Sequence, residues 1–87
     1  MAVYVDRAMI PYRGHRMCHM VADSREELDE MAVAIGLRRR WIQKAGTPHE
    51  HYDVTGTKRA EAVALGAVEI DRRALGLLLR AKREAMG

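Results

Sequence analysis

The sequence has no Phe, one Trp and only three Tyr. A core of stacked aromatic rings is therefore excluded, and the interior must come from Leu, Ile, Val, Met and Ala, with Met filling irregular gaps. A single cysteine, Cys18, excludes an intramolecular disulfide. The apolar runs are only a few residues long, far below the roughly 20 that cross a bilayer, and nothing in the sequence marks a signal peptide. These absences argue against membrane association and favour a cytoplasmic location.

The length and charge of the chain set further bounds. Its 87 residues, 48% hydrophobic and 31% charged, indicate one small globular domain over residues 1–87. Such a thin core favours a homodimer formed through an apolar helix face. The net charge of +3 is uneven, because residues 1–37 carry four Arg against six acidic residues, while residues 38–87 carry eleven Lys and Arg against six. The basic second part either attracts nucleic acid or another anion, or is a solvated face.

Local patterns predict alternating strands and helices. The best-defined helix begins at Ser24, which forms a capping box with Glu27, and ends at Gly36. A final helix begins after Asp71 and buries a stripe of Leu75, Leu78 and Leu79. The other expected elements are strands over 2–6, 15–23, 49–54 and 67–70, a loop over 7–14, a short helix or loop over 37–48, and a helix over 58–65.

This order predicts an α/β fold with a mainly parallel sheet of about four strands and three helices. In such a sheet, ligands collect beyond the carboxyl ends of the strands. Each predicted strand ends in or beside a carboxylate, and these are Asp6, Asp23, Asp53 and Asp71. Parallel strands would bring these groups to one rim.

Convergent carboxylates assisted by histidine can hold Mg²⁺ or Mn²⁺, and such an ion can activate water against a phosphodiester. We therefore expect Asp6, Asp23 and Asp53 to bind the metal. His19 and His51 would then act as base or additional ligand. In a strand, His49, His51 and Asp53 would share one face, a set that also suits Zn²⁺ or Fe²⁺, although Zn²⁺ is expected less than Mg²⁺ or Mn²⁺.

Structural explanations of the same residues stay open. Asp23 and Asp71 precede helices and can simply cap them, and Asp6 can open a loop as a turn residue. His19 lies in an apolar run, where a histidine that is merely satisfied by a buried partner is common. Cys18 and His19 are neighbours in a strand and point to opposite faces, which argues against a Cys–His nucleophile.

A cationic segment adjoins the only tryptophan. Arg38, Arg39, Arg40 and Trp41 can contact phosphates and stack on a base, or the ring can fill the core beside solvated arginines. The chain lacks a Gly-rich phosphate loop, a dinucleotide fingerprint and zinc-finger spacing. Several large enzyme classes are thereby disfavoured.

Several segments together resemble an uncharacterised family of short bacterial and phage proteins, the domain-of-unknown-function family 4031. They are "VYVD", "CHMVAD", "EEL", "HEHYDV", "KRAEAVALGAVEI" and "DRRAL", and they extend over nearly the whole chain. The family pattern falls on His19, Asp23, His51 and Asp53, whereas some relatives have His where this chain has Asp29. The resemblance implies no established activity.

Two functions follow as hypotheses. The first is a divalent-metal-dependent phosphoesterase or nuclease-like hydrolase with its site at the carboxyl rim of the sheet. The second is a non-enzymatic module that engages nucleic acid or an acidic protein through its basic second half, with the polar residues forming an internal hydrogen-bond network.

Overall fold

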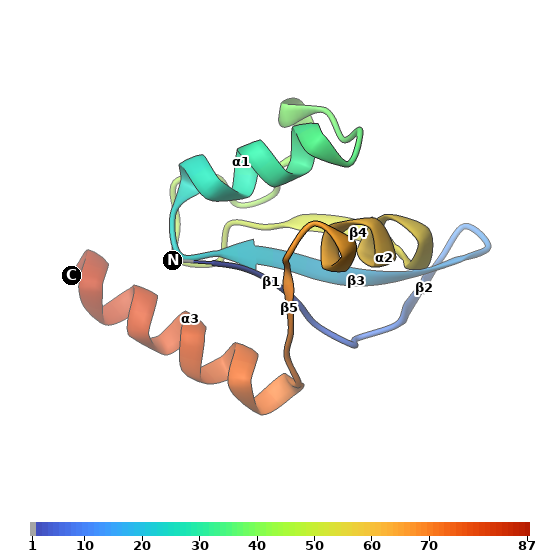
Figure 1. Ribbon diagram of the computed structural model, residues 1–87. Coiled ribbons are helices and arrows are strands. Elements are labelled where there is room, and N and C mark those ends of the chain that lie inside the picture. The colour runs from blue at the N-terminus through green and yellow to red at the C-terminus, as the bar shows by residue number, and fades with distance from the viewer. Residues whose placement is uncertain (1) are drawn as a thin grey trace.

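A computed structural model describes residues 2–87 of the chain. Within these residues it forms five strands, three α-helices and one 3₁₀ turn around a mixed sheet (Figure 1). The strands are β1 (Val3–Val5), β2 (Ile10–Tyr12), β3 (His15–Ala22), β4 (Tyr52–Thr55) and β5 (Val68–Glu69). The helices are α1 (Arg25–Ala34), α2 (Gly56–Ala64) and α3 (Arg72–Met86), with the 3₁₀ turn at Arg39–Trp41.

Strand β3 organises the sheet because it pairs along both edges. Met20 lies opposite Val5 of β1 on one edge and opposite Tyr52 of β4 on the other. Further along β3, Met17 lies opposite Ile10, so β1 and β2 follow one another along the same edge. These pairs are antiparallel, and within residues 2–87 only β1 and β5 run parallel. The prediction of a mainly parallel sheet of about four strands is therefore wrong, although the small α/β class with three helices is confirmed.

The predicted loop over residues 7–14 contains β2. Tyr12 lies opposite His15, so Arg13 and Gly14 form a two-residue hairpin turn. Both turn residues have positive φ, 47° and 80°, which matches the twist that a tight hairpin requires. Pro11 is tolerated because β2 is an edge strand that does not need every amide for pairing.

The two faces of the sheet differ in chemistry. Alternate residues of β1, β3 and β4 point toward α1 and α2 and form one buried cluster with them. Its largest fully buried side chains are Tyr52, Met20, Leu28, Val5, Val54 and Cys18. Because side chains alternate along a strand, the remaining residues of these strands, among them His19 and Asp53, point to the opposite face, as does Asp6, which directly follows β1.

Helix α3 lies on this second side of the sheet, opposite α1 (Figure 1). The Lys82 ammonium donates to the carbonyl of Ala22 at 3.1 Å. The stripe of α3 that was predicted to be buried, Leu75, Leu78 and Leu79, is only half-buried. None of the described residues of α3 is fully buried. The second face is therefore covered incompletely. No helix within residues 2–87 has the length and apolar character needed to cross a membrane.

Helix starts follow the predicted caps. The Ser24 hydroxyl accepts from the Glu27 amide at 3.2 Å and donates to the Glu27 carboxylate at 2.8 Å. The Asp71 carboxylate accepts from the Ala74 amide at 2.8 Å. Each cap satisfies an amide that the first helical turn leaves without an intrahelical partner.

Candidate metal centre

A row of polar side chains crosses three neighbouring strands on the second face. The Asp6 amide donates to the carbonyl of His19 at 3.0 Å, which fixes the end of β1 beside the middle of β3. On the other edge of β3, His19 lies opposite Asp53. His51 precedes Asp53 by two residues and shares its face. The antiparallel register thus brings these residues together across paired strands, and not at the rim of parallel strand ends that the sequence analysis predicted.

Asp6 orients His19. Its side chain is 5% exposed, and its Oδ2 lies 2.7 Å from His19 Nδ1. The other oxygen, Oδ1, accepts from the amides of His19 at 2.7 Å and Ala8 at 3.3 Å. Both carboxylate oxygens are thus engaged. A carboxylate bound in this way holds the imidazole with its proton on Nδ1 and its Nε2 lone pair directed outward.

His51 is oriented by the backbone. Its Nδ1 lies 2.7 Å from the carbonyl oxygen of His49. A carbonyl oxygen can only accept, so Nδ1 must carry the proton, and Nε2 of the neutral ring presents its lone pair. His49 contributes its main chain to the site, and its own ring is not among the clustered groups.

Asp53 completes the cluster. His51 Nε2 lies 3.4 Å and His19 Nε2 lies 4.0 Å from Asp53 Oδ1. One ligand atom from each of the three residues lies within 4.8 Å of the other two. The second oxygen, Asp53 Oδ2, accepts a hydrogen bond from the Gln43 amide group. The His19 and His51 rings meet edge to face, with centroids 5.2 Å apart.

The cluster is reachable from solvent. The side chains of His19 and Asp53 are 29% and 32% exposed, and that of His51 is 15% exposed. Next to His19 lies a pocket of about 540 Å³ between the end of β1 and the first turn of α3. Its lining includes Asp6, Arg7, Ile10, Asp71, Arg72 and Leu75. Two guanidinium groups therefore flank the polar row.

Asp23 stands apart from the cluster. Its carboxylate accepts from the Ala2 amide at 2.7 Å and from the Tyr4 hydroxyl at 3.0 and 3.2 Å. Burial and the contact with Asp23 raise the pKa of Tyr4 above its ordinary value. Since four strand residues span about 13 Å, Asp23, which directly follows β3, is too far from His19 to share an ion with it. Asp71 caps α3 and faces the pocket.

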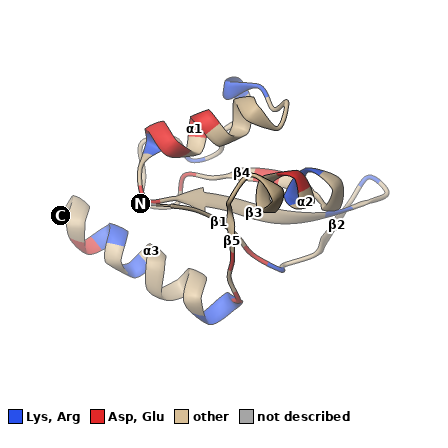
Figure 2. Cartoon of the chain, viewed as in Figure 1, with Lys and Arg blue, Asp and Glu red and all other residues tan. Residues whose placement is uncertain are grey.

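The other candidate groups occupy different parts of the molecule. Arg38, Arg39 and Arg40 are exposed, and Trp41 is 50% exposed rather than part of the core. Figure 2 shows this basic segment and the basic residues of α3 on opposite sides of the sheet, so they do not form one continuous face. Cys18 is fully buried on the apolar face, which agrees with the argument against a nucleophilic role.

Sequence reasoning missed three contributors. Gln43 holds Asp53, and its backbone exchanges two hydrogen bonds with His51, at 2.8 and 3.1 Å. Arg7 and Arg72 line the pocket although they are 65 positions apart in the sequence. The pairing of Gln43 with His51 arises inside a segment without regular strand alternation, so periodicity carries no signal for it.

The fold and the polar row together define a small mixed α/β protein with a two-histidine, one-aspartate cluster on the open face of its sheet. The chain belongs to the family described as a protein of unknown function (DUF4031), whose model matches residues 3–82. This match confirms the resemblance inferred from the sequence segments. The comparisons found no matching curated protein and no matching solved structure.

Proposed function

We propose that the protein is a divalent-metal-dependent hydrolase of phosphate esters, with His19, His51 and Asp53 as its metal ligands. One observation carries the proposal: three acceptor atoms face one another. Nδ1 of His19 is hydrogen-bonded to Asp6, and Nδ1 of His51 is hydrogen-bonded to the carbonyl oxygen of His49. In their neutral forms, both rings therefore present the Nε2 lone pair toward an oxygen of Asp53. When both rings are neutral, acceptors at such distances repel until a cation lies between them, and a divalent ion is the cation that this donor set suits.

The distances support this assignment. Ligand bonds of about 2.1 Å at a tetrahedral angle separate two ligand atoms by roughly 3.4 Å. The distances from Asp53 Oδ1 to the two Nε2 atoms, 3.4 and 4.0 Å, match this within small side-chain rotations. Asp6 and the His49 carbonyl supply the outer hydrogen bonds that metal-ligating histidines ordinarily have.

The donor set shifts the expected ion. Mg²⁺ prefers an all-oxygen shell, whereas two imidazoles with one carboxylate suit Zn²⁺ or Fe²⁺. We therefore propose Zn²⁺ or Fe²⁺ ahead of the Mg²⁺ and Mn²⁺ expected from the sequence. Three protein ligands leave at least one position for water, whose pKa a bound Zn²⁺ lowers to about 7.

The pocket beside the cluster suggests the substrate. Arg7 and Arg72 are the cationic groups of its lining, next to His19. A guanidinium group binds a phosphate through paired N–H donors. An anionic ester held there would lie beside the proposed ion, which would supply an activated water for hydrolysis.

Calorimetric titration of chelator-treated protein tests the metal site. We expect one Zn²⁺ or Fe²⁺ per chain, with binding abolished by Asp53→Asn or His51→Ala. His49→Ala is the matched control, because it removes a neighbouring ring but keeps the carbonyl that orients His51. If no divalent ion binds to the wild-type protein, the proposal is wrong. Metal-dependent turnover of bis(p-nitrophenyl) phosphate then tests the hydrolytic step.

A second candidate is the binding module, favoured by one specific observation. Trp41 is half-exposed beside three exposed arginines, a combination that can stack on a base while contacting phosphates. Salt-dependent nucleic-acid binding that is lost in Trp41→Ala, without any bound metal, would favour this function over the hydrolase.

A further inference from the structure

The β2–β3 hairpin is an exposed arm with an unusual composition. Every residue from 9 to 16 is exposed, and the hairpin extends beyond the helices at one end of the sheet (Figure 1). Residues 7–22 contain no acidic residue, but they contain three arginines, Arg7, Arg13 and Arg16. Since residues 9–16 of this arm add nothing to the buried cluster, their side chains are available for a ligand.

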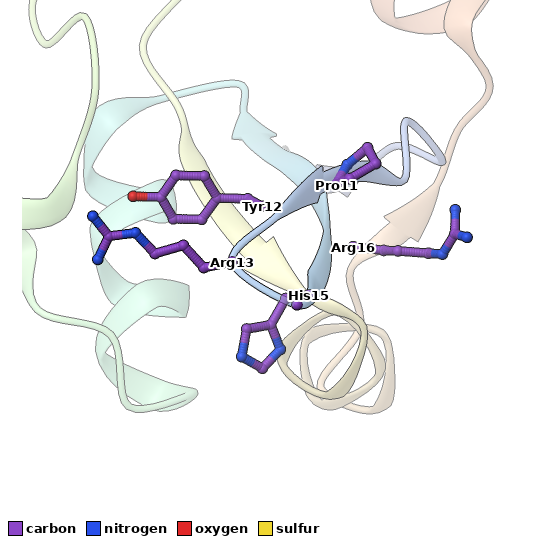
Figure 3. A pocket seen from close by; sticks show the side chains of 6 residues that line it. Pro11, Tyr12, Arg13, His15 and Arg16 are labelled. Atoms are coloured by element: carbon purple, nitrogen blue, oxygen red, sulfur yellow. The ribbon is translucent and has the colours of Figure 1, made fainter.

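Tyr12 and Arg13 form a pair at the end of this arm. The Arg13 guanidinium carbon lies 5.3 Å from the centre of the Tyr12 ring, and Tyr12 is 56% exposed. Figure 3 shows these two side chains extending together on one side of the hairpin, while Arg16 extends on the other. An open aromatic ring beside a guanidinium offers a stacking surface for a base and a cation for the adjoining phosphate.

The strand register connects this pair to the candidate metal centre. Tyr12 lies opposite His15 and Ile10 opposite Met17, so all four side chains share the face that carries His19. From His15 to His19 the strand spans about 13 Å, the length of about four stacked nucleotides. Ile10 also lines the pocket next to His19. The hairpin and the pocket thus form one continuous track.

We infer that this track binds a single-stranded polynucleotide, with a base stacked on Tyr12 and phosphates at Arg13 and Arg7. The cleavage step rests on the proposed function, but the binding does not. In that step water hydrolyses a phosphodiester: its oxygen bonds to phosphorus, the P–O bond to the leaving sugar oxygen breaks, that oxygen takes one proton of the water, and the other stays on the new phosphate monoester or is released. A single strand is favoured because its bases expose the ring faces that a duplex keeps stacked.

Fluorescence anisotropy in the presence of chelator tests binding independently of any metal. The probes are labelled oligothymidylate and oligouridylate of about 12 nucleotides, and a duplex of the same length. We expect Tyr12→Ala to weaken single-strand binding at least about tenfold, because stacking contributes strongly per base, and Tyr12→Phe to retain it. Arg13→Ala should also weaken binding, whereas Arg83→Ala, an exposed cation on α3, should change it little.

Several results would overturn the inference. One is that the single strand does not bind at low salt. Others are that Arg83→Ala and Arg13→Ala weaken single-strand binding equally, or that Tyr12→Ala leaves it unchanged. Binding of the duplex as tightly as the single strand would also contradict it. Displacement by poly-glutamate at equal charge concentration would indicate an acidic protein partner instead. Asp53→Asn separates the two proposals, because it should lose metal binding but still bind the single-stranded oligonucleotide in the anisotropy assay. Loss of oligonucleotide binding as well as metal binding in this variant would contradict the assigned track.

Discussion

The hydrogen bond between Asp6 and His19 gives the sharpest prediction of the metal proposal. Replacing Asp6 by Asn preserves the shape of the side chain and leaves an oxygen to accept from the His19 amide, now 2.7 Å from Asp6 Oδ1. The amide nitrogen of Asn would then face His19 Nδ1 as a donor. Nδ1 would have to accept, so the imidazole proton would move to Nε2. An Nε2 that carries a proton cannot bind a metal ion.

The expected magnitude follows from this change of tautomer. Loss of an outer hydrogen bond to a metal-ligating histidine typically weakens metal affinity 10- to 100-fold, which is about 1.4–2.7 kcal/mol. We expect Asp6→Asn to fall in this range. His51→Ala removes a ligand outright and should have a larger effect.

Competition calorimetry with Zn²⁺ measures the change, and circular dichroism checks that each variant is folded. Asp23→Asn is the control, because Asp23 also joins β1 to β3 through hydrogen bonds but lies outside the cluster. Wild-type affinity in a folded Asp6→Asn protein would refute the reasoning. An equal loss in Asp23→Asn would show that the effect comes from general destabilisation of the sheet.

Three further predictions concern stability. Tyr52→Phe should lower the free energy of unfolding by about 1.5–3 kcal/mol in urea titration, because the buried hydroxyl donates to Asp29 Oδ1 at 2.6 Å. Burial and this bond raise the pKa of Tyr52 from 10.0 to about 12. The stabilisation is therefore complete below pH 10 and is lost as pH rises through 12. In this range the free energy of unfolding of Tyr52→Phe should depend less on pH than that of the wild-type protein. Leu28→Ala, at a position 1% exposed, should cost about 2–5 kcal/mol by the same assay; a cost below 1 would contradict the assigned core. Gly14→Ala should cost about 1–2 kcal/mol through backbone strain alone, because φ is +80° and, apart from its chain neighbours, no residue has an atom within 4 Å of the added Cβ.

Local sequence signals predicted local structure well, because their physical causes are themselves local. Ser24 and Asp71 cap the helices as expected, and Tyr52 packs into the core opposite His51 and Asp53. The hairpin was missed, since Pro11 and Gly14 are signals of a break in regular structure. Here Gly14 makes the tight turn itself, and Pro11 pairs within an edge strand.

The direction of the strands could not be predicted from the alternation of elements. Alternating strands and helices favour parallel pairing only when each connection returns the chain to the end of the sheet at which the preceding strand began. Between α1 and β4, residues 37–51 instead form a long connection with a 3₁₀ turn and one isolated bridge, Gln43 with His51. The chain then enters β4 from the opposite end, antiparallel to β3.

The same reversal decides which of the predicted site residues lie close together. Asp6, His19, His51 and Asp53 share one face in any register that keeps the apolar residues on the other face, so their common side follows from alternation. Their proximity depends on register, which brings His19 opposite Asp53 and next to Asp6. The same register leaves Asp23 at the far end of β3.

The two faces of the sheet differ in what they carry: one holds the apolar core and the other holds the polar cluster. The apolar face packs against α1 and α2 and contains the largest buried side chains, so it provides most of the hydrophobic stabilisation. The second face buries little, because α3 covers it incompletely, yet it holds Asp6 almost wholly buried to orient one imidazole. A buried carboxylate is costly unless its hydrogen bonds are made, and Asp6 makes three. Its rigid placement, combined with ligand atoms that remain solvent-reachable, is what a preorganised metal centre requires. Substitutions of His51 or Asp53 should therefore remove metal binding while leaving the fold intact.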